Sequence, residues 1–394
     1  MSKIKILVFS PLSLEYGRGG EISSMELAEG LNKDYDVLFM DTNIIPGKQS
    51  LSKESLRKRK KKINYRGKLK FATMKIGGLI FSFPYPISLL KFLKYIKDVN
   101  VIYYSFSTFK MNLIFMFFNI LKRNKKFIIG YRKPLYSEKI FSLYNLKYRL
   151  SILFLSKFSK NVYHHALSEH AKKFLLNFYK SNRLFHITHG IDIKNFSLVG
   201  NRKLKSDHNL NFCYIGYLDD LHKGVGILLK GIDLFLKKNN LEDVKFEFIG
   251  KGPLEEKLAQ LAEKYGETIK FHGYIDNQYI AKYYQRNDVF LFTSRREPFP
   301  RSIMEALASE LIILSTKTIG SIELLKNKEF GIFIDSLDPV EIENKLLEIY
   351  HFWKNDFVKF TKIQILSKKY ISEKYSIQNE ILGFKDLLNT IFKY

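Results

Sequence analysis

The chain of 394 residues contains a single cysteine, Cys213. One thiol cannot form an internal disulfide framework or supply the cysteines of a structural zinc site. Long apolar runs are also missing, because the longest uncharged stretch, Ile76–Leu90, has fifteen residues and contains Pro84 and Pro86. A membrane-spanning helix needs about 20 apolar residues. The sequence therefore predicts neither a disulfide-stabilised scaffold nor a membrane-spanning protein.

Acidic side chains are scarce in the first half of the chain. Residues 1–200 carry 36 lysine and arginine residues against 12 aspartate and glutamate residues, whereas the remaining residues carry 29 against 27. This asymmetry indicates that the N-terminal half faces an anionic partner. Hydrophobic residues make up 46% of the chain, which excludes intrinsic disorder as its main description.

Short β-rich runs alternate with helix-length amphipathic runs along the whole chain. This alternation predicts parallel sheets with helices on both faces. Twelve strands are too many for one such sheet, so we expect an α/β protein with two doubly wound domains. The predicted strands are Ile4–Phe9, Val37–Met40, Val101–Tyr104, Phe127–Gly130, Asn161–His165, Phe185–Thr188, Asn211–Ile215, Lys245–Ile249, Ile269–His272, Val289–Phe292, Ile312–Ser315 and Gly331–Ile334.

The predicted domain boundary lies in the polar stretch Phe196–Asn211, where the charge balance also changes. We therefore expect a basic N-terminal domain over residues 1–196 and a C-terminal domain over residues 197–366. A helical tail, residues 367–394, is expected to pack back on the N-terminal domain. Two such domains facing each other would form a cleft at the carboxyl ends of their strands, where ligands bind in this architecture.

The segment Arg295–Ala306 carries the most specific motif. It follows the predicted strand Val289–Phe292 and opens a helix, and Pro300 suits a helix start because no N–H is needed there. The three amides that follow then point outward at the positive end of the helix dipole and form an anion site. These amides belong to Arg301, Ser302 and Ile303.

Two glutamates flank this predicted anion site. Glu297 lies in the loop after the strand, and Glu305 lies about one turn into the helix. Such a pair can bind sugar hydroxyls while the amides hold a phosphate. Taken alone, the segment fits equally well a surface helix cap with two solvated glutamates.

In the C-terminal half, four further predicted strands are followed by polar or glycine-rich loops. Lys223 closes the loop Gly216–Gly224, where its ammonium can meet a phosphate as a point charge, or can simply be a solvated loop lysine. Because the carboxyl ends of parallel strands share one edge of a sheet, these exits predict a ligand site there. The other three exits are Phe248–Pro253, Phe271–Tyr274 and Ile319–Glu323.

Together these motifs resemble those of GT-B glycosyltransferases of the retaining family four. Glu297 and Glu305 match that family's pair of glutamates separated by seven residues, and Lys223-Gly224 matches its donor loop. The other matching segments are Gly17–Glu21, Thr188–Asp192 and Gly320–Glu323. The resemblance implies a retaining hexosyltransferase that uses a nucleotide diphosphate sugar and has two Rossmann-like domains facing a cleft.

The resemblance also implies roles for individual residues. Glu297 and Lys223 would carry catalysis, the first by contacting the donor sugar near the reacting carbon and the second by neutralising the leaving diphosphate. Glu305 would hold the ribose, the backbone of Gly19 and Gly20 would approach the diphosphate, and the N-terminal half would hold the acceptor. The donor-binding residues implied in this way are Gly19, Gly20, Gly216, Tyr217, Lys223, Gly250, Tyr274, Glu297, Arg301, Ser302, Ile303 and Glu305.

Two positions of the donor half depart from the family pattern. Tyr217 stands where the family usually has an arginine, so one positive charge near the phosphates is missing. Arg295, Arg296 or Arg301 could replace it. Pro300 stands where the family usually has a glycine, which removes one amide donor.

A third departure lies in the N-terminal half. Tyr131-Arg132-Lys133 follows the predicted strand where many relatives carry a histidine. We take Glu21 and Arg132 as candidate acceptor-binding or catalytic residues. The alternative is a catalytically impaired partner protein of the same fold that binds nucleotide sugars without turnover.

A wholly basic run lies upstream of the apolar stretch Phe71–Leu90. Basic residues beside apolar ones suit an anionic membrane surface, at about 1 kcal/mol per lysine or arginine. We therefore expect a cytoplasmic protein, peripheral at the inner face of the cell membrane, with a lipid-linked or glycolipid acceptor. A solvated charge run and a nucleic-acid-binding arm are the alternatives, the second without a recognised nucleic-acid motif. The run comprises Arg57, Lys58, Arg59, Lys60, Lys61 and Lys62.

No cofactor or metal site is predicted. The triplet Asp34-Tyr-Asp36 precedes a strand and so lies at the wrong edge of the sheet for a ligand site. His164 and His165 lack the acidic or cysteine partners that would complete a metal-ligand set. We expect a metal-independent reaction with the nucleotide sugar as co-substrate, and the sequence leaves the oligomeric state open.

Overall fold

The computed structural model divides the chain into two compact units, which are described separately. Unit 1 comprises Met1–Gly190 and Ile377–Tyr394, and unit 2 comprises Ile191–Ser376. These boundaries follow residues 190 and 376, whereas the sequence predicted them after residues 196 and 366. Most of the predicted linker, residues 198–208, lies outside the described residues. The structure describes residues 3–16, 19–44, 53–76, 79–107, 112, 124–132, 143–158, 161–197, 209–325 and 329–393.

Unit 1 is built on a seven-stranded sheet whose strands run parallel. In spatial order they are β3 (Asn64–Leu69), β2 (Asp36–Thr42), β1 (Lys5–Phe9), β6 (Val101–Tyr104), β7 (Lys126–Tyr131), β8 (Val162–Ala166) and β9 (Leu184–His186). All except the edge strand β3 match strands predicted from the sequence. An antiparallel hairpin of β4 (Phe71–Ile76) and β5 (Leu79–Pro84) follows β3 and was not predicted either.

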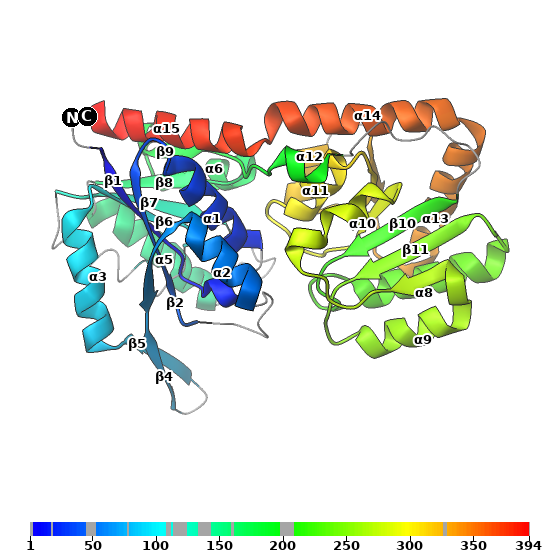
Figure 1. Cartoon of the computed structure of the whole chain (residues 1–394), viewed down its shortest axis with the longest axis horizontal. Coiled ribbons are helices and arrows are strands. Elements are labelled where there is room, and N and C mark those ends of the chain that lie inside the picture. Colours follow the sequence, from blue (N-terminus) through cyan, green and yellow to red (C-terminus); the bar gives the residue numbers. More distant parts are fainter. Residues whose placement is uncertain are drawn as a thin grey trace. The chain divides into compact units, whose positions relative to one another are not determined.

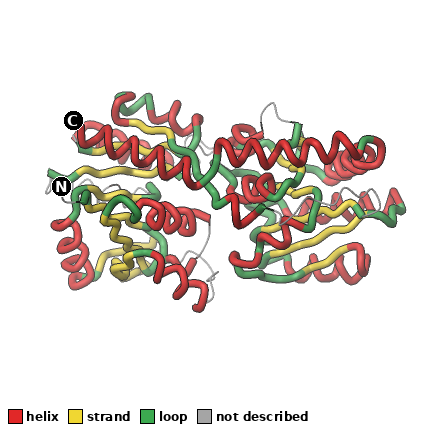
Figure 2. The backbone as a smooth tube through the Cα atoms, turned by 45° about the horizontal axis from the view of Figure 1, so that its top comes forward, coloured by secondary structure: helices red, strands yellow, loops and turns green. Residues whose placement is uncertain are grey.

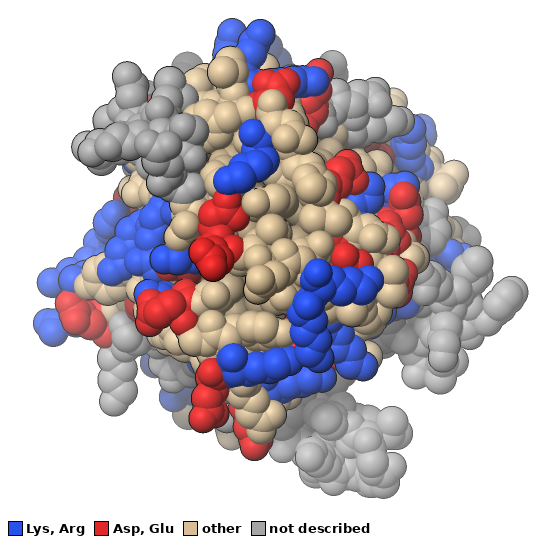
Figure 3. Space-filling view, turned by 90° about the vertical axis from the view of Figure 1, so that its right-hand side faces the viewer, with Lys and Arg blue, Asp and Glu red and all other residues tan. Residues whose placement is uncertain are grey.

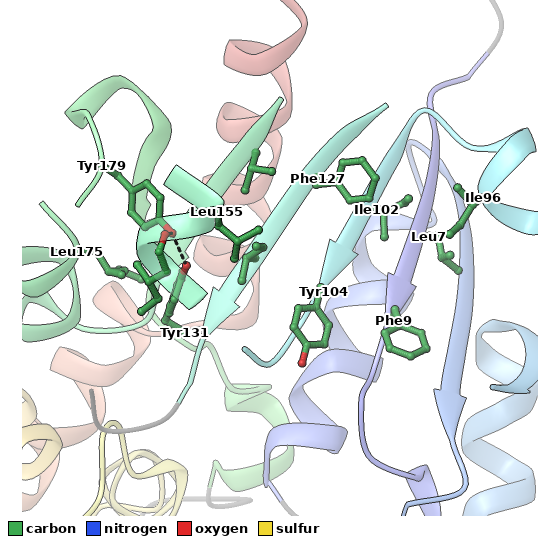
Figure 4. Close-up of a cluster of buried hydrophobic side chains, with 14 of the residues drawn as sticks. Leu7, Phe9, Ile96, Ile102, Tyr104, Phe127, Tyr131, Leu155, Leu175 and Tyr179 are labelled. Carbon is green, nitrogen blue, oxygen red and sulfur yellow. Dashed lines mark hydrogen bonds between the residues drawn. The ribbon is translucent and has the colours of Figure 1, made fainter. Parts of the chain in front are cut away.

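Both faces of this sheet are buried, as the apolar sequences of its central strands require. In β1, Ile6 and Val8 belong to one hydrophobic cluster, and Leu7 and Phe9 belong to the other. Figure 4 shows the second cluster, where side chains of β1, β6 and β7 pack with residues of the covering helices. The helices on that face are α3 (Pro86–Asp98), α5 (Leu143–Phe158) and α6 (Glu169–Leu175), and those on the opposite face are α1 (Gly19–Leu31) and α15 (Ile377–Lys393).

The basic run forms a helix, α2 (Lys53–Lys62), at the β3 edge of the sheet. Leu56 is buried, and the Lys60 ammonium lies 4.3 Å from the ring centroid of Tyr65 on β3. The Tyr65 hydroxyl donates to Asp41 at the end of β2 over 2.7 Å, and burial raises the pKa of Asp41 to about 6. These contacts hold β3 and α2 against the sheet. The remaining elements of unit 1 are η1 (Leu14–Tyr16) and η2 (Ser181–Arg183).

Unit 2 contains a six-stranded parallel sheet whose strands were all predicted from the sequence. In spatial order they are β12 (Ile269–Phe271), β11 (Val244–Ile249), β10 (Leu210–Ile215), β13 (Val289–Phe292), β14 (Ile312–Thr316) and β15 (Gly331–Ile334). Figure 2 shows strands lying between helices, as the alternating sequence pattern predicts. The helices are α7 (Ile193–Phe196), α8 (Val225–Asn239), α9 (Glu255–Tyr265), η3 (Gly266–Thr268), η4 (Asn277–Tyr279), α10 (Ala281–Gln285), α11 (Arg301–Ala308), α12 (Ile319–Leu325), α13 (Pro339–Asn355) and α14 (Phe357–Lys374).

Strand order reverses once in each sheet, beside its first strand. In unit 1, β1 lies between β2 and β6, and in unit 2, β10 lies between β11 and β13. At such a switch point the loops of the two neighbouring strands diverge, which leaves room for a ligand at the carboxyl ends. Gly19 and Gly20 follow β1 of unit 1, and Lys223 and Glu297 follow β10 and β13 of unit 2.

The predicted tail, residues 367–394, is divided between the units. Residues up to Ser376 belong to unit 2, where Lys368 on α14 pairs with Glu310 at 2.8 Å. Helix α15 packs on unit 1 beside α1, as Figure 1 shows, and Lys385 pairs with Asp34 at 2.7 Å. The C-terminal helix that returns to the N-terminal unit is therefore α15 alone.

The structure supports an α/β protein with two Rossmann-like units. Within the described part of the chain, no helix is both long and apolar enough to cross a bilayer. On the face shown in Figure 3, acidic and basic side chains are interspersed.

Candidate active site

The backbone of the loop after β10 packs closely against the backbone of the loops after β11 and β13. A Cβ atom on Gly250, whose φ is +152°, would lie 1.8 Å from the carbonyl oxygen of Gly216. A Cβ atom on Gly224, whose φ is +64°, would lie 2.5 Å from the carbonyl oxygen of Thr293. Glycine is therefore required at positions 250 and 224. The loop is held between the exits of β11 and β13, which places Lys223 beside the β13 exit.

Hydrogen bonds fix the backbone of Lys223. Asp219 Oδ1 accepts from the N–H groups of His222 at 3.1 Å and Lys223 at 2.8 Å. The Thr293 hydroxyl donates to the Lys223 carbonyl over 2.8 Å. The backbone from which the Lys223 side chain projects is thus held against the end of β13.

The structure brings Lys223 and Glu297 together. Lys223 Nζ donates to Glu297 Oε2 over 2.8 Å, and the two side chains are 29% and 26% exposed. The pair joins the loops of β10 and β13 at the switch point. Its partial exposure leaves both groups open to a ligand, so the ammonium can exchange its carboxylate partner for a phosphate oxygen.

Helix α11 begins directly after this pair. Pro300 is its N-cap residue and contributes no side-chain cap. The first-turn amides of a helix have no partner within it, and among the described residues no acceptor faces the amides of Ser302 and Ile303. Gly320 packs against Pro300, and its N–H donates to the Glu297 carbonyl over 3.0 Å. The start of α12 therefore supports the loop that presents Glu297 and the α11 amides.

Glu305 is a buried carboxylate and is not solvated as a surface cap would be. The residue is 8% exposed. Its Oε2 accepts from the Tyr284 hydroxyl over 3.2 Å, and its Oε1 lies 3.5 Å from Arg301 Nε. Burial, together with the neighbouring Glu305, raises the pKa of Tyr284 well above its usual value, so the hydroxyl remains a donor. Sequence reasoning missed Tyr284, because no spacing relates it to Glu305.

The three arginines that could compensate for Tyr217 lie in different surroundings. Arg295 Nε donates to the Asp220 carbonyl over 3.1 Å, so this side chain lies along the β10 loop. Arg296 is exposed. The Arg301 side chain is 10% exposed and lies beside Glu305.

Other predicted donor residues line the same edge of the sheet. The carbonyl of Tyr217 accepts from the Tyr214 hydroxyl over 3.0 Å. The Gly250 N–H donates to the Gly273 carbonyl over 2.8 Å, which ties the exits of β11 and β12 together. Tyr274 follows that exit, is 42% exposed, and has the Lys251 ammonium 4.7 Å from its ring centroid.

In unit 1, Gly19 and Gly20 form the first residues of α1, and Glu21 is buried in its first turn. Residues 17 and 18 of the predicted glycine motif, and Lys133, lie outside the described residues. Arg132 is buried at the end of β7, and its guanidinium donates to the Gly20 carbonyl over 3.0 Å. The structure therefore brings Arg132 to the glycine turn.

No group of three or more metal-ligating side chains was found among the described residues. Asp34 and Asp36 precede β2 and so lie at the amino end of the strand. His164 and His165 are buried and lie within hydrogen-bond distance of the hydroxyls of Tyr131 and Tyr103.

Parts of the chain resemble known glycosyltransferases in sequence. Residues 209–351 match the family model described as glycosyl transferases group 1. An uncharacterized glycosyltransferase of Methanocaldococcus jannaschii, MJ1607, is 26% identical over 159 residues, which cover 40% of this chain and 39% of that protein. The capsular polysaccharide biosynthesis glycosyltransferase CapM of Staphylococcus aureus is 25% identical over 242 residues, covering 58% and 61%. The chain thus spans less than two thirds of these relatives' lengths.

Similarity to solved structures extends over almost the whole chain. The crystal structure of Anabaena Alr3699/HepE in complex with UDP has a TM-score of 0.74 at 17% identity, covering 98% of this chain and 100% of that chain. At this identity the likeness concerns the fold. Residues 209–351 thus match the model of the glycosyl transferases group 1 family, and the chain as a whole has the GT-B fold.

Proposed function

We propose that this protein transfers a hexose-type sugar from a nucleotide diphosphate sugar to a hydroxyl acceptor, with retention of anomeric configuration. The bond between the anomeric carbon and the diphosphate breaks, and a bond from that carbon to the acceptor oxygen forms. The acceptor hydroxyl loses its proton, and the nucleoside diphosphate leaves with the bonding electrons. The main requirement is thus positive charge at the leaving diphosphate.

The observation that carries the proposal is the 2.8 Å contact between Lys223 and Glu297, beside the open amides of α11. Lys223 and these amides would stabilise the leaving diphosphate, and Glu297 would contact the donor sugar. Glu305, oriented by Tyr284, would hold the ribose. Retention is proposed from the resemblance of the two glutamates to the family-four pair.

We propose a uridine donor as the first to test, because the Anabaena structure contains UDP. The full chain should show a higher melting temperature with one UDP-sugar than with the others. That donor is then incubated with the protein and with membrane lipid extracts, which supply the acceptor. The reaction should release UDP and yield a glycolipid. NMR should show that the sugar of this glycolipid has the same anomeric configuration as the donor. Binding without turnover would favour the alternative of an impaired nucleotide-sugar-binding protein.

The reaction is proposed to need no metal, because Lys223 and the α11 amides supply the positive charge. Turnover should therefore persist in excess EDTA. Activity lost with EDTA and restored by a divalent cation would contradict this part of the proposal.

A lipid-linked acceptor at the inner face of the cell membrane is proposed from the surface of unit 1. Four basic side chains of α2 are exposed. The second, third and fourth lie one, four and five residues after the first, which places all four on one face of the helix. They are Arg57, Lys58, Lys61 and Lys62. Helix α3, which also contacts β3, exposes Ile87 by 73% and Leu90 by 66%. Cationic and apolar side chains on elements around one strand suit an anionic membrane surface.

Replacing these four α2 residues by glutamine is expected to weaken binding to vesicles containing an anionic phospholipid at least a hundredfold. The basis is about 1 kcal/mol per basic residue near the headgroups. Co-sedimentation at low salt measures the effect. The matched control replaces four exposed lysines of α14, Lys359, Lys362, Lys369 and Lys374, and should bind like the unmodified protein. Equal losses in both variants would show a general charge effect and contradict a membrane role for α2.

A further inference from the structure

Arg132 is a buried cation with neutral partners. Its Nη1 donates to the Gly20 carbonyl over 3.0 Å and to the Ser23 hydroxyl over 3.2 Å, and its Nη2 donates to the Tyr103 hydroxyl over 3.3 Å. The residue is 6% exposed, and the contacts of its guanidinium among the described residues are all with neutral groups. A buried charge carries a large desolvation cost. None of its direct partners carries a charge that could compensate Arg132.

The groups behind Tyr103 add no such charge. His165 Nε2 lies 2.7 Å from the Ile187 carbonyl, which can only accept, so Nε2 carries the ring proton. His165 Nδ1 then accepts from the Tyr103 hydroxyl over 3.0 Å, which leaves the tyrosine oxygen to accept from Arg132. Burial lowers the pKa of His165 to about 3, so this ring is neutral.

The C-terminal helix supplies a buried carboxylate on the other side of Ser23. The Glu380 side chain on α15 is fully buried, and its Oε2 accepts from the Gly190 N–H over 2.8 Å. Its Oε1 lies 3.5 Å from His189 Nδ1, and the same nitrogen lies 2.8 Å from the Ser23 hydroxyl. Contacts thus run from Glu380 through His189 and Ser23 to Arg132.

The two charges also act on the same neighbours. Burial raises the pKa of Tyr103, an effect that Arg132 opposes and Glu380 strengthens. Both charges also influence His165. Arg132 and Glu380 therefore belong to one electrostatic network, although no direct contact joins them among the described residues.

We propose that Arg132 and Glu380 are positioning residues that together hold the first turn of α1, so that docking of the C-terminal helix completes the glycine turn of unit 1. Arg132 acts through the Gly20 carbonyl and the Ser23 hydroxyl, and Glu380 provides its counter-charge. This inference depends on the proposed function at one point only, which is that the Gly19–Gly20 turn binds substrate.

The test compares Arg132→Met, Glu380→Gln and the double variant in the full chain. In Arg132→Met, Glu380 loses its counter-charge, and the melting temperature should fall by about 5–10 °C. Turnover should fall at least tenfold, while the affinity for UDP, which unit 2 would bind, should change less than twofold. The double variant has neither buried charge, so it should regain much of the melting temperature. Its turnover should stay low, because the Gly20 carbonyl still lacks its donor.

Hydrogen exchange supplies a readout that does not depend on turnover. The amides of residues 21–25 should exchange faster in Arg132→Met and in Glu380→Gln, which retains the side-chain shape and can still accept from Gly190. Lys385→Gln, which removes the α15 ion pair with exposed Asp34, should leave these amides unchanged. Turnover that recovers with stability in the double variant, or unchanged exchange in both single variants, would overturn the proposal. Absent turnover in the unmodified protein would instead count against the proposed function.

Discussion

Replacing Lys223 by methionine is expected to lower turnover about a hundredfold to a thousandfold, the usual loss when one preorganised charge-stabilising donor is removed. The melting temperature should change little, because a pair with both side chains more than a quarter exposed contributes about 0–1 kcal/mol to stability. Methionine keeps the length and apolar stem of lysine but lacks its ammonium. Single-turnover rates with a saturating donor, measured beside a thermal melt, test the prediction.

The matched control is Lys230→Met, which removes an exposed lysine from α8 within the same unit. It should retain the turnover of the unmodified protein. Glu297→Gln keeps the shape of the carboxylate but not its charge, and it should also lose turnover if Glu297 contacts the reacting sugar. Lys223→Met with near-normal turnover would mean that the ion pair is structural and that the leaving diphosphate is stabilised elsewhere.

The central strands of unit 2 could be predicted from the sequence because they are buried on both faces. Val289–Phe292 and Ile312–Thr316 are continuous apolar runs bounded by polar exits, the pattern of parallel strands covered on both faces. The candidate residues follow from the same pattern, because chemistry-bearing side chains come directly after such runs. This explains why Lys223 and Glu297, 74 positions apart, could be expected at one edge of the sheet.

The edge strand β3 of the unit 1 sheet could not be predicted from a run of apolar residues. β3 reads Asn-Tyr-Arg-Gly-Lys-Leu, and its charged residues and Gly67, with a φ of +104°, hide the strand pattern. Lysine and arginine are typical of edge strands, where they discourage further pairing. The basic run before it forms a helix because both residue types are good helix formers and Leu56 provides a buried anchor.

The buried partners of the candidate residues were also beyond sequence reasoning. Glu380 meets Gly190 across 190 positions, and Tyr284 meets Glu305 from a separate helix. A buried tyrosine or glutamate gives no periodic signal of its own, because its partner is set by tertiary packing. The sequence indicated a returning helix, but not that this helix carries a carboxylate into unit 1.

Replacing Gly250 by alanine is expected to destabilise unit 2 by about 3–6 kcal/mol, from the combined cost of overpacking and backbone strain. The new Cβ would lie 1.8 Å from the backbone oxygen of Gly216, and its φ of +152° is rarely adopted by other residues. Since the clash is with backbone, the exit of β10 or of β11 has to move. The melting temperature should fall by about 10 °C or more, and UDP affinity should fall with it, because the loop that carries Lys223 moves.

Gly266→Ala provides the comparison that separates the clash from the backbone conformation. Gly266 also has a positive φ, +52°, but a Cβ atom at this position would meet no neighbouring atom of the described residues within 4 Å. Its substitution should cost about 1–3 kcal/mol, the strain of a backbone conformation (φ +52°, ψ −125°) that other residues rarely adopt. UDP affinity should be unchanged, because Gly266 begins η3, which leads into the amino end of β12 and so lies away from the carboxyl edge. Equal melting temperatures for the two variants would mean that the β10 loop yields easily, and that Lys223 is not held in place by the packing of Gly216 on Gly250.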